Sequence, residues 1–402
     1  MFDILVITPW FPNSRTGWPA RFVADSALAL AAAGARTRVG VIRGWVPPLM
    51  ARFVNAEHRG SIRTEQFPEL SIRTMRYPTV PGGFARRLTN MAIDYFLTRH
   101  LKGAFAIRRP DAIHVHTEAL APAAVAFGKA HGVPVVVTIH GEHTDSRYLL
   151  ANGQRDRFQL ALAEADRVII VGESLRKHVA TLADKADHIE VVWNGVWPPH
   201  TLRQVPDPDV AFVEFITVAN LQEGKGVELF LSALATLEGE GYQNWRLRII
   251  GGGPWRERLA DQVLRDNLAD KVVFMGRMQN DEVFSELATS DVFVLPSYRE
   301  AFGIAYLEAM ASGLLTIGVR GQGPSQFITD GKTGYLTEPR DVDSLTGLLR
   351  WVLTTSRKEW RQVASQGRIR ARQYSWDAHA DKLLCLFAEV VAESRRGQDA
   401  HL

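Results

Sequence analysis

Residues 292–308, Val-Phe-Val-Leu-Pro-Ser-Tyr-Arg-Glu-Ala-Phe-Gly-Ile-Ala-Tyr-Leu-Glu, join a short apolar run to a helical pattern through a loop that carries an acid. The run Val292–Leu295 predicts a buried strand, and the apolar spacing after Gly303 predicts a helix over residues 304–312. A strand followed by a loop and a helix is the unit from which parallel sheets with crossover helices are built. This stretch therefore predicts an α/β protein.

Glu300 and Glu308 stand on either side of the start of this predicted helix. A helix N-terminus presents unpaired N–H groups and a partial positive charge, which suit a diphosphate. Glu300 precedes the helix, where it can meet a sugar hydroxyl. Glu308 lies more than a turn inside, where it can accept both hydroxyls of a ribose. A surface loop before a buried helix is the structural alternative, but the order strand, Pro296, acid, Gly303, acid favours a nucleotide-sugar site.

The same alternation of short β-branched runs with helical patterns continues along the chain and predicts parallel sheets. In the first half, the predicted strands are Asp3–Thr8, Thr37–Ile42, Ala112–His116, Val133–Ile139, Arg167–Val171 and Ile189–Val192. In the second half, they are Glu214–Ala219, Arg246–Ile250, Val272–Met275, Val292–Leu295 and Leu315–Ile317. Predicted helices cover about residues 20–33, 226–237, 255–266, 280–289, 304–312, 341–354 and 357–372.

A domain boundary follows Asn194-Gly195, because the prolines at 198, 199, 206 and 208 predict a turn and then a stiff linker. We therefore expect two Rossmann-like, doubly wound domains that face a cleft, residues 1–200 and 201–375. A last amphipathic helix, residues 376–395, is long enough to cross back to the first domain. Residues 43–83 are rich in Arg and Pro, and we expect long irregular loops there.

Three more loops follow predicted strands and carry residues suited to a ligand. In the stretch Val218–Gly226, Lys225 lies at the entry to a predicted helix, where an ammonium can meet phosphate oxygens, although a solvated loop lysine is the alternative. Gly251–Pro254 permit close backbone approach, but they lack the downstream acid of the dinucleotide fingerprint. Pro12–Gly17 follow the first strand, where a doubly wound sheet places ligand loops. His140 also follows a strand and is expected to point into the crevice.

A metal site is the competing interpretation of the histidines, which are His114, His116, His140 and His143. They lie at the ends of different strands and lack the spacing of a dedicated zinc site. Two Asp-x-Asp pairs, at residues 207–209 and 341–343, fall in the linker and at a predicted helix start, where both have a structural explanation. We therefore expect no metal and no resident cofactor.

The composition of the 402-residue chain, 46% hydrophobic and 23% charged, is globular and suits two α/β domains. Cys385 is the single cysteine, so an internal disulfide is excluded. The first apolar run is short and contains Asp3, which does not resemble a signal peptide. The sequence also has no run of about 20 apolar residues, the length that spans a membrane. We expect a cytoplasmic protein.

The charge is distributed unevenly, because residues 1–110 carry 16 Lys or Arg against 6 Asp or Glu while the whole chain has a net charge of +3. Residues 84–107 form an amphipathic pattern whose apolar members are Phe84, Leu88, Met91 and Tyr95. The basic residues on or beside it are Arg86, Arg87, Arg99, Lys102, Arg108 and Arg109. A helix packed on the first sheet with a solvated basic face is the structural interpretation. The functional one is peripheral docking on an anionic inner leaflet. We expect no nucleic-acid partner.

These residues resemble the family 4 retaining glycosyltransferases of the GT-B fold, over nearly the whole chain. The shared motifs are Gly17, Val137–His140, Asn194–Val196, Lys225-Gly226, Gly251–Pro254, the Glu300 and Glu308 pair with Phe302-Gly303, Gly331–Leu336 and Ser375-Trp376. The resemblance implies a nucleoside-diphosphate sugar donor in the second domain and a glycan or lipid-linked acceptor mainly on the first. It also implies retention of the donor's anomeric configuration, in polysaccharide or glycolipid synthesis.

The resemblance further implies a role for individual residues. Glu300 and His140 would be catalytic, facing the transferred sugar from the donor side and the acceptor side. Lys225 would hold the diphosphate and Glu308 the ribose. The other donor-binding residues that it implies are Gly17, Asn220, Gly253, Arg277, Met278, Arg299, Ala301, Phe302 and Gly303.

Two positions depart from the family pattern, because Asn220 stands where many members have Arg and Gln326 where Glu is usual. With Asn220 neutral, Lys225 carries more of the phosphate charge unless Arg277 or Arg299 contributes. A nucleotide-sugar epimerase of the same fold and a noncatalytic nucleotide-sugar-binding module are the alternatives. A nicotinamide dehydrogenase is disfavoured because the fingerprint glycines are missing.

Overall fold

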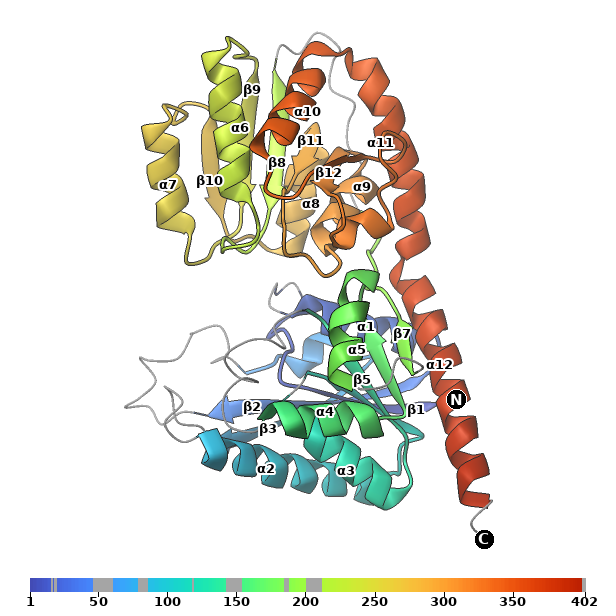
Figure 1. Ribbon diagram of the computed structural model, residues 1–402. Coiled ribbons are helices and arrows are strands. Elements are labelled where there is room, and N and C mark those ends of the chain that lie inside the picture. The colour runs from blue at the N-terminus through green and yellow to red at the C-terminus, as the bar shows by residue number, and fades with distance from the viewer. Residues whose placement is uncertain are drawn as a thin grey trace. The chain divides into compact units, whose positions relative to one another are not determined.

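The computed structural model describes residues 1–15, 17, 20–45, 61–78, 86–117, 119–141, 154–183, 188–199 and 212–399 (Figure 1). The chain divides into two compact units. Unit 1 comprises Met1–Gly195 together with Trp376–Leu402, and unit 2 comprises Val196–Ser375. Unit 2 is therefore one continuous segment, whereas unit 1 is completed by the C-terminal end of the chain.

Unit 1 is built on a parallel sheet with the order β3-β2-β1-β4-β5-β6-β7 among the described residues. The strands are β1 (Asp3–Thr8), β2 (Arg36–Trp45), β3 (Ser71–Pro78), β4 (Ala112–His116), β5 (Val135–Ile139), β6 (Arg167–Ile170) and β7 (Ile189–Val191). The strand order reverses between β1 and β4, and ligands of doubly wound sheets bind at such a reversal, beyond the carboxyl ends of the strands. β1, β4 and β5 are buried along their whole length because helices cover both faces of the sheet.

The helices of unit 1 are α1 (Arg21–Ala32), α2 (Arg86–Ile107), α3 (Ala121–His131), α4 (Gln154–Glu164), α5 (Arg176–Ala183) and α12 (Trp376–Asp399), with short 3₁₀ turns η3 (Thr64–Gln66) and η5 (Glu173–Leu175). α1 packs against α12, while α2, α3, α4 and α5 follow one another as neighbours (Figure 1). α12 contributes Leu383, Phe387 and Val390 to the core of unit 1, each at most 1% exposed. The expected return of the last helix to the first domain is thus observed.

Unit 2 is a second parallel sheet with the order β10-β9-β8-β11-β12-β13. Its strands are β8 (Val213–Val218), β9 (Trp245–Ile250), β10 (Val272–Gly276), β11 (Val292–Val294), β12 (Leu315–Val319) and β13 (Tyr335–Thr337). Its helices are α6 (Val227–Gly239), α7 (Arg256–Arg265), α8 (Asn280–Ala288), α9 (Ile304–Ser312), α10 (Val342–Thr354) and α11 (Arg357–Ala371), with η6 (Gly323–Gln326) and η7 (Arg372–Tyr374). The order reverses between β8 and β11, so the predicted class of two Rossmann-like units is confirmed.

The prediction of irregular loops over residues 43–83 is wrong in part. Ser71–Pro78 form β3, which pairs in parallel with Arg38–Trp45 of β2. Every side chain of β3 is at least partly exposed, because the strand lies at the edge of the sheet. An edge strand of this kind lacks the apolar alternation from which strands are predicted. Residues 46–60 and 79–85 lie outside the described part of the chain.

The chain passes between the two units at two neighbouring places. Val196 N–H donates to the carbonyl oxygen of Tyr374 at 2.8 Å, and Val196 also forms a parallel bridge with Ser375. Gly195 lies so close to Trp376 that a Cβ atom would stand 2.5 Å from its backbone nitrogen. The two crossing segments therefore run side by side.

None of the helices in the described residues combines the length and the apolar character that a membrane span requires.

Candidate active site

Three loops of unit 2 meet at the carboxyl ends of neighbouring strands. The loop after β8 contains Gly224–Gly226, the loop after β9 contains Gly251–Gly253, and the loop after β11 runs to Gly303. Backbone hydrogen bonds join them, since Leu221 N–H donates to the carbonyl of Gly252 at 2.9 Å and Tyr298 N–H donates to the carbonyl of Gly224 at 2.9 Å. Most of the sequence-predicted donor residues of this half therefore lie on one connected set of loops. Arg277 and Met278 follow β10 instead, and Glu308 lies in α9 (Ile304–Ser312).

Three glycines of these loops combine a positive φ with packing that leaves no room for a side chain. Gly226 has φ +69° and would place a Cβ 2.0 Å from the carbonyl oxygen of Pro296. Gly251 has φ +130° and would place a Cβ 1.8 Å from the carbonyl oxygen of Ala219. Because both positions bring backbone against backbone at positive φ, any side chain there would displace a loop. Gly253, with φ +154°, is packed in the same way against Leu221.

Lys225 and Glu300 form an ion pair at the centre of this site. Lys225 Nζ lies 2.8 Å from Glu300 Oε2, and the two side chains are only 20% and 13% exposed. The position of Glu300 is fixed further by its backbone, because its N–H donates to Gln322 Oε1 at 3.0 Å and its carbonyl accepts from Gly323 N–H at 2.8 Å. A lysine ammonium has three donors, so two remain for a further oxygen ligand.

The sequence predicted separate partners for these two residues, the diphosphate for Lys225 and the sugar for Glu300. The structure shows that they also contact each other, which places a carboxylate and an ammonium within one ligand's reach. The spacing of 75 residues between them gave no indication of this contact.

The other cations of the site pack on its glycines. A Cβ on Gly224 would stand 3.1 Å from Cβ of Arg299, and a Cβ on Gly252 would stand 2.9 Å from Nε of Arg277. Both arginines are exposed, and so is Asn220, whose amide donates to Gln222 Oε1 at 3.1 Å. Arg299 and Arg277 thus pack on the loops that follow β8 and β9, whereas Asn220 supplies no charge there. Met278 follows β10 and is partly buried.

Helix α9 begins directly after the loop that carries Glu300. Gly303 precedes it with φ +93°, and the helix has neither a side-chain cap nor an acidic residue in its first turn. Its positive end is therefore uncompensated by its own residues. Glu308 lies in the second turn of the helix, as the sequence predicts, and its side chain is partly buried.

Gln326 holds the loop before α9 in place. Its Nε2 donates to the carbonyls of Gly323 at 3.0 Å and Ala301 at 3.5 Å. An ionised glutamate has no proton to donate to these carbonyls, so the departure from the family pattern has a local structural reason. Phe302 is 2% exposed and packs its ring on Phe327 and Tyr374, which anchors the same loop.

In unit 1, the buried side chain of Arg43 holds the loop after β1 in place. The sequence patterns did not indicate this role of Arg43. Arg43 is 6% exposed, and it donates to Asn13 Oδ1 at 2.8 Å and to the carbonyl of Phe11. Burial, together with the charge of Arg76, lowers the pKa of Arg43. Gly17 closes the described part of this loop, with its N–H donating to the carbonyl of Ser14 at 3.0 Å. Thr16, Trp18 and Pro19 lie outside the described residues.

His140 belongs to a cluster of four histidines from three elements of unit 1. His116 Nδ1 and His140 Nε2 are 2.8 Å apart, and the ring centroids of His114 and His116 are 4.2 Å apart. His379 of α12 joins from the other side, with Nδ1 2.7 Å from the carbonyl of Trp193 and Nε2 2.8 Å from Ser26 Oγ. His114 and His116 are 1% and 2% exposed.

The environment keeps these imidazoles neutral. Burial and the neighbouring histidines lower the pKa of His114 to about 3 and hold that of His116 well below its usual value. Burial and His379 lower the pKa of His140 to about 3, and burial lowers that of His379 to about 4. Because Trp193 offers only a carbonyl, Nδ1 of neutral His379 carries the proton, and its Nε2 accepts from Ser26.

The cluster surrounds a cavity of about 10 Å³, the space of roughly one water molecule. His114 Nδ1, His116 Nε2 and His140 Nδ1 are buried and have no hydrogen-bond partner among the described residues. Among those residues no group of three or more His, Cys, Asp or Glu side chains has the arrangement of a metal site. His143 lies outside them. The Asp341 carboxylate caps α10 by accepting from Ser344 N–H at 2.9 Å.

Two family models match this chain. The model described as Glycosyltransferase Family 4 matches residues 20–198, and the model described as Glycosyl transferases group 1 matches residues 201–370. The two matches meet near residue 200 and together leave only the ends of the chain outside.

Curated relatives extend the comparison. The chain is 28% identical over 302 residues to a glycogen synthase of Mycobacterium tuberculosis, which covers 72% of this chain and 70% of that protein. It is 33% identical over 197 residues to a GDP-mannose-dependent alpha-mannosyltransferase of Corynebacterium glutamicum. That alignment covers 48% of this chain and 44% of the relative.

Solved structures share the fold. A sucrose-phosphate synthase from Thermosynechococcus elongatus superposes with a TM-score of 0.75 at 19% identity, over 98% of this chain and all of that chain. The Anabaena protein Alr3699/HepE, solved in complex with UDP and glucose, superposes with a TM-score of 0.72 at 16% identity, over 97% of this chain and 100% of that chain.

Proposed function

This chain belongs to the family 4 glycosyltransferases of the GT-B fold, and we propose that it transfers a sugar from a nucleoside-diphosphate donor to a glycan or lipid-linked acceptor. The Lys225–Glu300 ion pair carries the proposal, because it joins a phosphate-binding cation to a carboxylate beside the uncompensated end of α9. The relatives named for GDP-mannose support a nucleotide-linked donor. The product would belong to a surface polysaccharide or a glycolipid.

In the proposed reaction, cleavage of the anomeric bond leaves negative charge on the nucleoside diphosphate. A diphosphate is a good leaving group and needs cationic stabilisation more than a proton, and each such donor is worth roughly 3 kcal/mol. Lys225 and the N-terminus of α9 would supply it without a metal ion. Gly17 would allow the first-domain loop to approach the phosphates, and backbone near Met278 would contact the base.

We further propose that the donor's anomeric configuration is retained. The carboxylate of Glu300 is paired with Lys225 at 2.8 Å, which makes it a poor nucleophile for a covalent intermediate. Attack of the acceptor from the leaving-group side, with a phosphate oxygen taking the acceptor's proton, is therefore the proposed course. His140, whose Nε2 contacts His116, would face the sugar from the acceptor side.

A thermal-shift screen of the protein with UDP, GDP and ADP tests the donor class. A nucleotide at a hundred times its Kd stabilises the native state by about 2.7 kcal/mol, so one of the three should raise the melting temperature by several degrees. The preferred nucleotide then selects the sugar donors for transfer assays with and without acceptor lipids. No shift with any of the three would contradict the proposal, and conversion of a donor without an acceptor would favour an epimerase.

Glu308→Ala should weaken binding of that nucleotide about tenfold while leaving the fold intact. The reason is the place of Glu308 in the second turn of α9, where a carboxylate can accept both ribose hydroxyls. Calorimetric titration measures the change, and Glu359→Ala, an exposed acid on α11, is the matched control. Unchanged affinity in the Glu308 variant would remove the ribose assignment.

We also propose that the enzyme docks on the cytoplasmic face of an anionic membrane through α2. The inner side of α2 packs in unit 1, with Leu97 and Leu101 both 0% exposed. Its outer side exposes Leu88, Met91 and Tyr95 at 66%, 66% and 60%. The exposed Arg99 and Lys102 continue this stripe at helical spacing. An apolar stripe that continues into basic residues is suited to an anionic bilayer surface. Phe84 lies outside the described residues.

Co-sedimentation with lipid vesicles tests this docking. The wild type should bind vesicles that contain anionic lipid, and binding should weaken at high salt because each basic residue near the surface adds about 1 kcal/mol. Leu88→Ser with Met91→Ser should reduce binding at least tenfold. Leu264→Ser, equally exposed at 65% but on α7, should not. Binding that is indifferent to lipid charge and salt would point to a soluble acceptor instead.

A further inference from the structure

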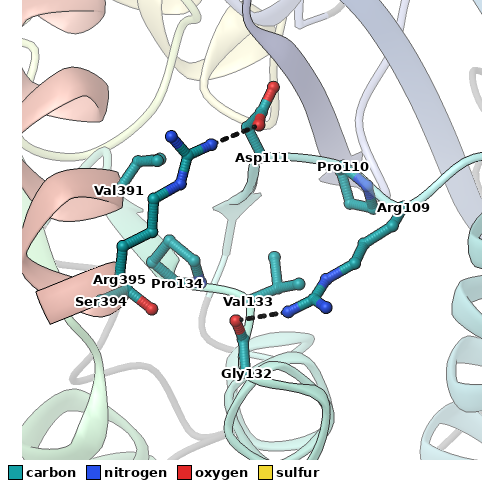
Figure 2. Close-up of a pocket in the computed structure, with 9 residues that line it drawn as sticks. All are labelled: Arg109, Pro110, Asp111, Gly132, Val133, Pro134, Val391, Ser394 and Arg395. Atoms are coloured by element: carbon teal, nitrogen blue, oxygen red, sulfur yellow. Dashed lines mark hydrogen bonds and ion pairs between the residues drawn. The ribbon is translucent and has the colours of Figure 1, made fainter. Parts of the chain in front are cut away.

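A second polar pocket lies in unit 1, away from the ligand loops. Its volume is about 280 Å³, and it is lined by the segment Arg109–Asp111 before β4, by Gly132–Pro134 before β5 and by Ser394 and Arg395 near the end of α12 (Figure 2). These segments lead into the amino ends of parallel strands, whereas His140 and Gly17 follow the carboxyl ends. Within unit 1, the pocket is therefore at the opposite end of the strands from the loops that carry Gly17 and His140.

Two arginines face the pocket from opposite sides (Figure 2). Arg109 Nη2 donates to the carbonyls of His131 and Gly132, both at 2.9 Å, so the C-terminus of α3 fixes its guanidinium. Arg395 Nη2 reaches Asp111 Oδ1 only at 3.4 Å. A guanidinium has five N–H donors, and the described contacts of each arginine use one nitrogen. Both therefore keep donors for a ligand in the pocket.

Positive charge is in excess around the amino ends of these strands. Asp3, 2% exposed at its side chain, is contacted by three guanidinium groups at 2.7, 3.2 and 3.9 Å, those of Arg38, Arg108 and Arg36. Its N–H donates to Asp111 Oδ2 at 2.9 Å, so the two aspartates belong to one cluster. Asp166 accepts from Val135 N–H at 2.8 Å, and Arg167 pairs with Glu393 at 2.8 Å. With these groups, Arg109 and Arg395, six guanidinium groups lie among four carboxylates, an excess of two positive charges. Such a cluster attracts an anion.

We propose that this pocket binds a phosphate group, as a phosphomonoester or a phosphodiester. Guanidinium groups match phosphate oxygens in pairs, and Ser394, beside Arg395 on α12, offers a hydroxyl (Figure 2). A volume of about 280 Å³ leaves room for a phosphate with a small attached group. The ligand is either a free phosphorylated metabolite or a lipid headgroup. The proposal is independent of the proposed sugar transfer.

Calorimetric titration of the full-length protein with inorganic phosphate, at constant ionic strength set with chloride, tests the site. The wild type should bind phosphate, and Arg395→Ala should weaken binding about tenfold. Arg396→Ala removes the same charge one residue away without lining the pocket and should change the Kd less than twofold. Arg109→Lys, which keeps the charge but loses the planar fork, should weaken binding as well and avoids the loss of stability that Arg109→Ala could cause.

A second arm separates the two sources of phosphate. Vesicles that contain phosphatidic acid are mixed with the Leu88→Ser, Met91→Ser double variant, and Arg395→Ala or Arg396→Ala is added to it in parallel samples. In this double variant α2 contributes little to vesicle binding. Residual binding that Arg395→Ala abolishes and Arg396→Ala leaves would support the pocket and identify a lipid headgroup. Binding of inorganic phosphate without such residual binding would support a soluble ligand. The proposal is overturned if neither is observed, or if Arg396→Ala weakens binding as much as Arg395→Ala.

Discussion

Replacing Lys225 by alanine is expected to slow sugar transfer about a hundredfold or more, which corresponds to a loss of roughly 2–4 kcal/mol of transition-state stabilisation. Lys225 is the partly buried cation at the entry of α6, and Asn220 supplies no second charge beside it. Its removal also leaves the carboxylate of Glu300, 13% exposed, without its 2.8 Å partner. Steady-state kinetics with a saturating acceptor measure the effect.

The ion pair makes a further, sharper expectation testable. Because Lys225 and Glu300 contact each other, their effects should not add, and the double variant Lys225→Ala, Glu300→Ala should be much faster than the product of the single losses implies. Lys358→Ala, an exposed lysine on α11, is the control and should retain full activity. Near-normal transfer by the Lys225 variant would move the phosphate role to Arg277 or Arg299.

Unit 1 is expected to lose stability steeply between pH 6.5 and pH 4. In the unfolded chain a histidine titrates near 6.5, whereas in the folded protein the pKa of His114 lies at about 3 and that of His116 well below 6.5. The unfolded state therefore takes up protons first as the pH falls, so stability is complete above pH 6.5 and decreases below it. For these two rings the loss is roughly 3 kcal/mol per pH unit, against a total stability of about 5–15 kcal/mol.

Thermal unfolding followed from pH 7.5 to pH 4.5 measures this loss, and unit 2 provides an internal control. Among residues 196–375 the only histidine is His200, so the transition of unit 2 should shift much less. His114→Leu with Thr138→Val removes both partners of a 2.7 Å hydrogen bond. The stability of unit 1 should then fall less steeply with decreasing pH, by the contribution of one histidine. Equal shifts of both transitions would contradict the histidine explanation.

The parts of the fold that the sequence predicted are those in which local pattern and burial agree. β1 and β4 have the predicted bounds because each is a short buried run that contains β-branched residues. β3 and β13 escaped prediction, since an edge strand with exposed side chains and a three-residue strand leave no periodic signal.

For the candidate site as well, the sequence predicted local positions but not contacts between distant residues. Gly226, Gly251 and Gly303 were placed correctly between strand and helix, because loops of this fold have fixed positions relative to the sheet. The contact between Lys225 and Glu300 was not predicted, nor was the contribution of His379 to the cluster of His140. Those contacts join residues far apart in the chain and depend on the packed tertiary structure.

The insertion of unit 2 between Gly195 and Trp376 sets an order of folding on the ribosome. Residues 196–375 leave the exit tunnel as one continuous segment and can fold as soon as β13 and α11 are complete. Unit 1 begins earlier but must wait for α12, which supplies Leu383, Phe387 and Val390 to its core. A released chain that ends near residue 375 should therefore carry a protease-resistant second half and a sensitive first half. In the folded protein, a helix synthesised after unit 2 completes the core of the unit whose synthesis began before it.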